Sequence, residues 1–117
     1  MKRFVALYLG TPEARSSWDK LSEAERKERE AAGMKAWGDW MTTNAKSVVE
    51  TGGPLGKTKR IDSKGISDTR NGVAGYVVVQ AESHDAAAKL FVNHPHFAIF
   101  PGDCVEIMEV LPIPGPS

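Results

Sequence analysis

The 117-residue sequence lacks several features that define specialised classes of protein. It has one cysteine, Cys104, so an internal disulfide is impossible and a reducing compartment is expected. No apolar run approaches the roughly 20 residues of a membrane span. The N-terminal stretch is typical of a strand and carries no secretory signal pattern. We therefore expect a cytoplasmic protein without a membrane partner.

Net charge is absent as well. Fifteen Lys and Arg balance fifteen Asp and Glu, which leaves a formal charge of zero at pH 7. A neutral chain has no general attraction to nucleic acid or to anionic membranes. We therefore expect no nucleic-acid partner.

Motifs for nucleotides and metals are also missing. Residues 52–58 end in Gly-Lys-Thr but follow a predicted helix, whereas a phosphate-binding loop follows a strand. No cysteine pair or His-Glu-x-x-His motif is present, so no cofactor and no metal are expected. A metal site built on His94 and His96 would have to recruit Asp103 or His84.

The elements that are present predict one α+β domain over residues 1–117. Hydrophobic residues make up 41% and charged residues 26%, as in ordinary globular domains. The apolar patterns and turn residues predict strands at 3–9, 57–62, 73–81 and 104–111, helices at 22–51 and 83–94, and an irregular tail at 112–117. The order β-α-β-β-α-β is that of a ferredoxin-like fold, with a four-stranded antiparallel sheet and both helices on one face.

The long helix is predicted from its start signal and its apolar face. Ser22 and Glu25 fit a capping box, and a glycine pair before Pro54 would end the helix. The core-facing stripe is predicted to consist of Met34, Trp37, Met41, Ala45 and Val48. A short helical turn is an option for the polar connection at 11–21.

Both faces of the predicted sheet are apolar, although two helices can cover only one. In the first strand Val5 and Leu7 alternate with Phe4 and Ala6, and the third strand shows the same pattern. Monomers seldom expose a large apolar face. The six-residue tail is too short to cover four strands, so we expect a homodimer that packs through the open sheet face.

Segments along most of the chain carry a family resemblance. They are Phe4–Tyr8, Gly52–Leu55, Gly75–Ser83, His94-Pro95 and Val105–Val110. In this order they resemble the YCII-related family of dimeric α/β-barrel proteins. The resemblance implies a homodimer and permits an enzyme, because related scaffolds include isomerases, dehalogenases and cofactor-free oxygenases.

The chain departs from that family in two places. Many relatives carry Asp-Gly-Pro-Phe before the third strand, where this chain has residues 67–72. Relatives near the namesake pair an Asp-Pro after the second helix with a His in the first helix. Here the Asp position is His94 and the first helix has no His, so that acid–base pair cannot be transferred.

His94 and His96 are the candidates for catalysis. Imidazole titrates near neutrality, which suits a general acid or base. The alternative is a structural role at the end of the second helix. The loop from His94 to Asp103 is rich in aromatic residues, and loops of this kind often carry function.

A second group of residues is predicted to bind a small molecule. Trp37, Trp40 and Asn44 form an aromatic and amide flank on the long helix, which suits the wall of a pocket. Tyr76 and Asp103 are further candidates, with Tyr8 expected on the same sheet face as Tyr76. Packing in the core or the dimer interface is the alternative for the tryptophans.

Two functions from different classes remain open. The first is an enzyme that acts on a small organic molecule by acid–base chemistry, such as an isomerase, a lyase or a dehalogenase. The second is a non-catalytic dimeric module that binds a metabolite or a partner. The first requires an imidazole and a second polar group to converge on one concave pocket, which we expect between the long helix and the sheet.

Overall fold

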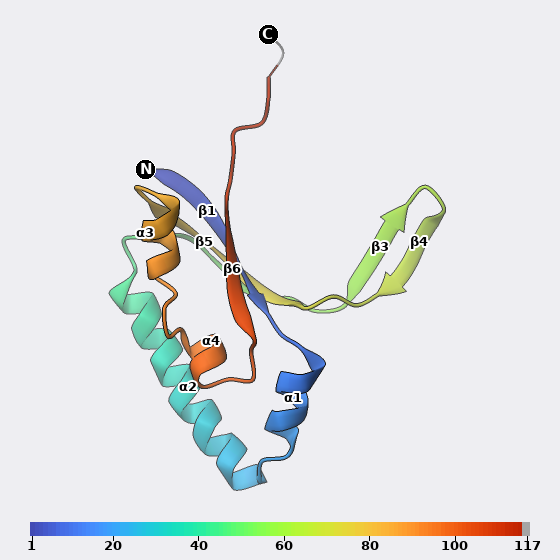
Figure 1. Cartoon of the computed structure of the whole chain (residues 1–117), viewed down its shortest axis with the longest axis vertical. Helices are drawn as coiled ribbons and strands as arrows, with labels where there is room; N and C mark the ends of the chain where they lie inside the picture. Colours follow the sequence, from blue (N-terminus) through green and yellow to red (C-terminus); the bar gives the residue numbers. More distant parts are fainter. Residues whose placement is uncertain (116–117) are drawn as a thin grey trace.

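Four antiparallel strands form the sheet at the centre of the fold (Figure 1). The computed structural model describes residues 1–115. The strands are β1 (Lys2–Leu9), β2 (Val48–Pro54), β5 (Val73–Ala81) and β6 (Cys104–Glu109), in the order β2-β5-β1-β6. Each neighbouring pair is antiparallel, which is the arrangement predicted for a ferredoxin-like α+β fold.

Helices cover one face of this sheet. The helices on this face are α2 (Glu23–Thr43), α3 (His84–Lys89) and α4 (Pro95–Ala98), and α1 (Pro12–Asp19) follows the end of β1. Figure 1 shows α2, α3 and α4 together on one side of the central strands. Among the residues described, no helix is both long enough and apolar enough to cross a membrane.

The core lies between these helices and alternate residues of β1 and β5. Phe4, Ala6 and Tyr8 of β1 are buried with Val77 and Val79 of β5. Successive residues of a strand point to opposite faces, so the residues between them lie on the other side. That side, the open face, carries Val5, Leu7, Tyr76, Val78 and Met108, which pair across the strands and are half-buried or exposed.

The long helix begins as predicted but ends earlier. The capping box is present, with the Glu25 N–H donating to Oγ of Ser22 at 3.1 Å. The helix stops at Thr43, where the Asn44 side chain donates to the carbonyl oxygen of Trp40 at 2.9 Å. The prediction of helix at 44–51 is wrong, because the β-branched pair Val48–Val49 pairs into the sheet beside β5.

The predicted core stripe of this helix is therefore partly wrong. Met34 is 70% exposed, Ala45 is exposed and Val48 lies on β2. The face that packs on the sheet instead carries Trp37 and Trp40.

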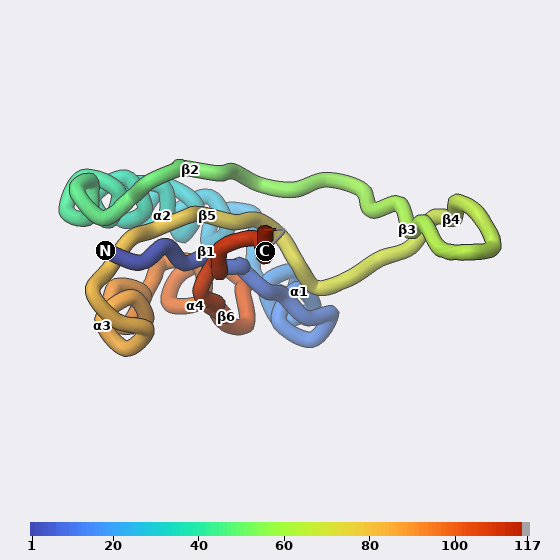
Figure 2. The backbone as a smooth tube through the Cα atoms, turned by 90° about the horizontal axis from the view of Figure 1, so that it is seen from above, coloured from blue at the N-terminus to red at the C-terminus, as the bar shows by residue number. Residues whose placement is uncertain are grey.

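The strand predicted at 57–62 lies outside the central sheet. It is β3 (Thr58–Asp62), which pairs only with β4 (Gly65–Thr69) in a separate two-stranded hairpin. No strand was predicted within residues 63–72, yet β4 lies there. It forms because Ser63 and Lys64 make a tight two-residue turn before Gly65, whose φ is 121°. We call residues 57–70 the hairpin arm. It projects away from the body of the molecule (Figure 2).

The remaining connections follow from caps and prolines. Thr11 caps α1 by accepting from the N–H of Ala14 at 3.1 Å. Ser83 caps α3 by accepting from the N–H of Ala86 at 3.1 Å, at the start predicted for the second helix, although this helix ends at Lys89 and not at residue 94. Pro95 then starts the short α4, since proline suits the first turn of a helix. Residues 112–115 of the tail have no helix or strand, and residues 116–117 lie outside the described residues.

Candidate functional site

A cavity of about 650 Å³ lies between α2 and the ends of β1, β2 and β5. Its walls are largely aromatic, with Tyr8, Trp37, Tyr76, His96 and Phe100 among the lining residues. Met34 and Gly38 of α2 and small residues of β2 and β5 complete the lining, and among the described residues it contains no Asp, Glu, Lys or Arg. A concave, mostly apolar surface with few polar groups is typical of small-molecule sites.

Tyr8, Thr51 and Tyr76 each bring a hydroxyl group to this cavity, and the side chain of Tyr8 is buried on the helix side of the sheet. Its position on β1 points the ring toward the helices, where it packs against Trp37 at a centroid distance of 4.9 Å. The rings of His94 and His96 lie 5.1 and 5.2 Å from it. Burial raises the pKa of Tyr8, so the hydroxyl stays protonated at neutral pH.

His94 is fully buried behind Tyr8. The backbone turns inward at Asn93, whose φ of 59° lies in the left-handed region that asparagine tolerates. Nδ1 of His94 accepts a hydrogen bond from the N–H of His96 at 3.0 Å, and Nε2 lies 3.5 Å from the Tyr8 hydroxyl. Burial, with a smaller contribution from His96, lowers the pKa of His94 to about 4. His94 is therefore neutral at pH 7 and carries its proton on Nε2.

His96 lines the cavity itself. Its Nε2 lies 2.7 Å from the carbonyl oxygen of Leu9. A carbonyl can only accept, so Nε2 carries a proton and Nδ1 is the acceptor of the neutral ring. Among the described residues, every fully buried side-chain nitrogen or oxygen atom has a hydrogen-bond partner. Nδ1 of His96 has no hydrogen-bond partner, so this atom is not fully buried and can be reached by solvent or a ligand.

The backbone around His96 is shaped to hold the ring in place. A Cβ at Gly102 would overlap the Cε1 and Nε2 atoms of His96, so only glycine fits there. Leu9 holds the loop from its other side, because its carbonyl also accepts from the N–H of Asp103 at 2.8 Å. The 94–103 loop is thus fixed to the end of β1.

These contacts leave two complementary groups at one cavity. The Tyr8 oxygen can accept from Nε2–H of His94, which leaves the hydroxyl proton for another acceptor. Nδ1 of His96 offers a lone pair. A ligand in the cavity would therefore meet the Tyr8 hydroxyl as a hydrogen-bond donor and the His96 imidazole as a proton acceptor, beside aromatic walls and the further hydroxyl of Thr51.

The other residues predicted for the site divide into two groups. Trp37 and Tyr76 border the cavity, and Trp40, Asn44 and Asp103 do not. Trp40 packs against His94 and donates from Nε1 to the carbonyl oxygen of Leu90 at 2.7 Å, while Asn44 caps α2. Asp103 is exposed beside a different surface depression.

Tyr8 and Tyr76 lie on opposite faces of the sheet, which corrects the expectation that they share one. Tyr76 stands opposite Leu7 in the strand register and so belongs to the open face. There its hydroxyl donates to Oε1 of Glu50 at 2.6 Å. This contact to Glu50 raises the pKa of Tyr76.

Sequence reasoning missed Tyr8 and Phe100 as parts of the site. Tyr8 could have been recognised from the sequence because it places a hydroxyl group on the same strand face as the apolar residues Phe4 and Ala6. His84, the further metal candidate, stacks on Phe4 and lies 2.8 Å from the carbonyl oxygen of Ile107. Within residues 1–115 no group of three or more His, Cys, Asp or Glu could hold a metal ion.

Comparison with known proteins relates the fold to an enzyme. No family model matches the sequence, and no curated protein matches it either. Among solved structures, a similar one is the 5-chloro-2-hydroxyhydroquinone dehydrochlorinase TftG from Burkholderia phenoliruptrix AC1100, in complex with 2,5-dihydroxybenzoquinone. The match has a TM-score of 0.52 and 17% identity, and it covers 91% of this chain and 90% of the other. The two chains share one fold.

Proposed function

We propose that the protein is a homodimeric enzyme of the YCII-related kind that acts on a small cyclic organic compound by proton transfer. The observation that carries this proposal is the convergence of Tyr8 and His96 on the aromatic cavity. Fold likeness alone would not suffice, because one fold supports many functions.

The walls of the cavity suggest the class of substrate. Aromatic rings and small residues suit a flat ring, and the lack of charged side chains in the described lining favours a compound without a strong charge. The proposed substrate also carries a hydroxyl or carbonyl oxygen, which the Tyr8 hydroxyl would bind. The dehydrochlorinase of similar fold was solved with a dihydroxybenzoquinone, which supports this choice.

Each group has a defined role in the proposed step. Nδ1 of His96 removes a proton from a carbon next to a carbonyl group. The electron pair of that C–H bond forms a carbon–carbon double bond to the carbonyl carbon, and the π pair of the carbonyl group moves onto its oxygen. The Tyr8 hydroxyl donates a hydrogen bond to this oxygen and stabilises its negative charge. The electron pair then either takes the proton back at another carbon, which is isomerisation, or expels a leaving group, which is elimination.

Buried His94 acts as a positioning residue in this proposal. Its neutral Nε2–H directs the Tyr8 hydroxyl proton away from the core and toward the cavity. Trp37 packs against the Tyr8 ring, with the two ring centroids 4.9 Å apart, and so holds this ring beside the cavity.

The test is a screen of phenols, hydroquinones, quinones and cyclic enones against the purified protein. Binding is followed by NMR of the Trp37 indole and His96 imidazole, and turnover by the loss of each compound. We expect at least one compound to be converted and His96→Gln to abolish conversion while binding persists. Binding without any conversion would favour the alternative, a non-catalytic dimeric module, and no binding at all would contradict both.

A further inference from the structure

The hairpin arm is isolated from the rest of the molecule. All of its residues except Thr58 are exposed, and no element of the body packs extensively against β3 or β4. Figures 1 and 2 both show it projecting on the side away from α2 and α3. A two-stranded hairpin is only marginally stable in water by itself, so this arm needs a surface to pack against.

The dimensions of the chain also indicate that part of its surface is available to pack against a partner. Its radius of gyration is 16.5 Å, whereas a compact chain of this length has about 13 Å. Its accessible surface is 8480 Å², against about 6,200 Å² for a compact monomer of this size. The excess of roughly 2,000 Å² exceeds the roughly 800 Å² that each partner buries in a standard interface.

The tip of the arm displays an apolar pair. Ile61 and Ile66 stand opposite each other in the β3–β4 register and are 71% and 74% exposed. Both strands are edge strands, and exposed apolar side chains on an edge favour association with another chain. The tip therefore has the character of an interface.

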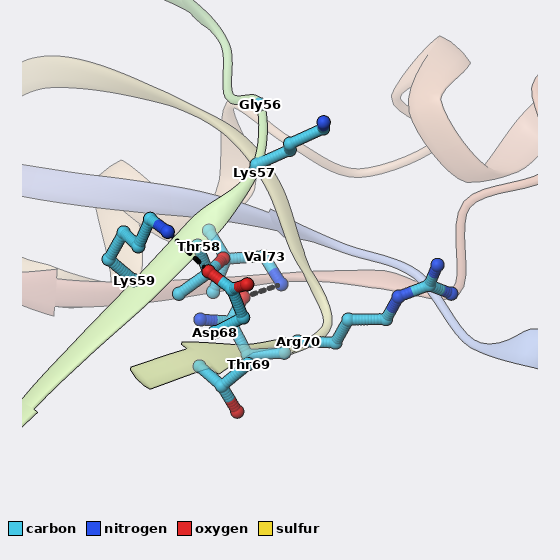
Figure 3. A pocket seen from close by; sticks show the side chains of 9 residues that line it. Gly56, Lys57, Thr58, Lys59, Asp68, Thr69, Arg70 and Val73 are labelled. Carbon is cyan, nitrogen blue, oxygen red and sulfur yellow. Dashed lines mark hydrogen bonds and ion pairs between the residues drawn. The ribbon is translucent and has the colours of Figure 1, made fainter. Parts of the chain in front are cut away.

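The arm as a whole is positively charged, although Arg60 next to the apolar pair is in an ion pair with Asp62 at 3.2 Å. The arm contains five Lys or Arg against two Asp, a net charge of +3, so the rest of the neutral chain carries −3. Figure 3 shows the base of the arm, where Lys59 pairs with Asp68 while the Arg70 side chain extends away from that pair. The cavity at this base, of about 590 Å³, is also lined by Lys57.

A complementary surface exists at the C-terminal end of the same sequence. Residues 82–109 contain five Asp or Glu against Lys89 alone, a net charge of −4. On β6, the exposed Glu106 shares one strand face with the exposed Met108, while the half-buried Glu109 stands on the other face. The exposed apolar residues Val110 and Leu111 follow directly after the strand. A strand that carries acidic and exposed apolar side chains is complementary in charge and in hydrophobicity to the basic arm with its exposed isoleucines.

We propose that the hairpin arm is a clasp that docks onto β6 of a second copy of this chain. The arm leaves the sheet from β2 and β5, whereas β6 is the opposite edge strand, so the arm lies remote from β6 of its own chain. It projects on the side of the sheet that the helices leave open, where the partner in the proposed face-to-face dimer would lie. This contact adds to that dimer and does not depend on the chemistry of the cavity.

Nucleic acid is the less favoured partner for the arm. The two Asp residues reduce its positive charge, and the arm has no aromatic side chain on which a base could stack. The apolar pair at the tip would also remain exposed in such a complex.

The test measures the dimer dissociation constant by sedimentation equilibrium. The double variant Ile61→Ser with Ile66→Ser is compared with Val92→Ser, a matched control because Val92 is 68% exposed on the body. We expect the double variant to raise Kd tenfold or more and Val92→Ser to leave it within twofold. Glu106→Lys with Glu109→Lys should raise Kd as well, and the effect should weaken in high salt.

Hydrogen exchange provides a second measurement on the unmodified protein. Amides of β3 and β4 should be protected at concentrations above Kd and exchange rapidly below it. An unchanged Kd in the isoleucine variant overturns the clasp while leaving the sheet-face dimer intact. A monomer at every concentration overturns both, and loss of RNA or DNA binding with an unchanged Kd would assign the arm to nucleic acid instead.

Discussion

Nδ1 of His94 accepts a hydrogen bond from the backbone N–H of His96, and this single contact determines the chemistry of the cluster. It leaves the His94 proton on Nε2, which faces the Tyr8 hydroxyl. The two imidazoles also have different roles. His94 supports Tyr8 from within the core, while His96 borders the cavity.

The first prediction concerns acid stability. Unfolded His94 has a pKa of about 6.5, and burial lowers it to about 4 in the folded protein. Between these values the unfolded state binds a proton that the folded state does not, so stability falls as the pH drops from 6.5 to 4. Across this pH range the free energy of unfolding falls by about 3 kcal/mol at most.

The variant His94→Asn isolates this contribution, because asparagine can still cap α4 but does not titrate. Urea unfolding at pH 7 and pH 4 should show that the wild type loses about 3 kcal/mol more than the variant. Equal losses would show that burial of His94 does not govern acid stability.

The second prediction concerns the hydroxyl of Tyr8. Tyr8→Phe keeps the ring contacts with Trp37 and His96 and removes only the donor. A compound that binds through its oxygen should lose about 1 kcal/mol of binding free energy, roughly a fivefold weaker Kd, by calorimetry. Catalysis should fall further, by about a hundredfold, if charge develops on that oxygen. Unchanged affinity and turnover would remove Tyr8 from the site.

The third prediction concerns the glycine behind His96. In Gly102→Ala the new methyl group overlaps the imidazole, so the ring must move and lose its bond to the Leu9 carbonyl. We expect a loss of about 1–3 kcal/mol in the free energy of unfolding and a shifted His96 resonance. Gly10→Ala is the control, because nothing lies within 4 Å of a Cβ there.

The fourth prediction concerns the open face of the sheet. Val78→Asp places a charge on the central strand β5, where the proposed homodimer would bury it at a cost of several kcal/mol. Light scattering should then show a monomer. Lys27→Asp changes an exposed residue of α2 whose ion pair with Glu23 is surface-exposed, so its effect should stay within about 0.5 kcal/mol. A Val78→Asp protein that remains dimeric would contradict the sheet-face interface.

Local patterns in the sequence were enough for most of the sheet. The alternation in β1 and β5 predicted both strands and which residues of one strand share a face, because the period of two is a property of neighbouring residues. It did not predict which face of β5 matches which face of β1, so Tyr8 and Tyr76 were wrongly expected on one face. The starts of α2 and α3 followed from Ser22 and Ser83, whose side chains bond within three residues. These features depend only on residues that are close together in the sequence.

Other features depended on contacts between distant segments. The end of α2 at Thr43 was missed because the pairing of Val48 with β5, across some thirty residues, outweighs a continuing helical pattern. The strand predicted at 57–62 was likewise assigned to the wrong sheet, since strand propensity does not specify a partner.

The candidate site shows the same division. His94 and His96 could be singled out from the sequence as a titratable pair beside a proline, and Trp37 as part of an aromatic flank. That Tyr8 meets both imidazoles, of which His94 lies 86 residues further along the chain, was decided only by the tertiary structure. Local pattern governs how each segment folds, whereas the packing of β1 against α2 and α4 determines which side chains share a cavity.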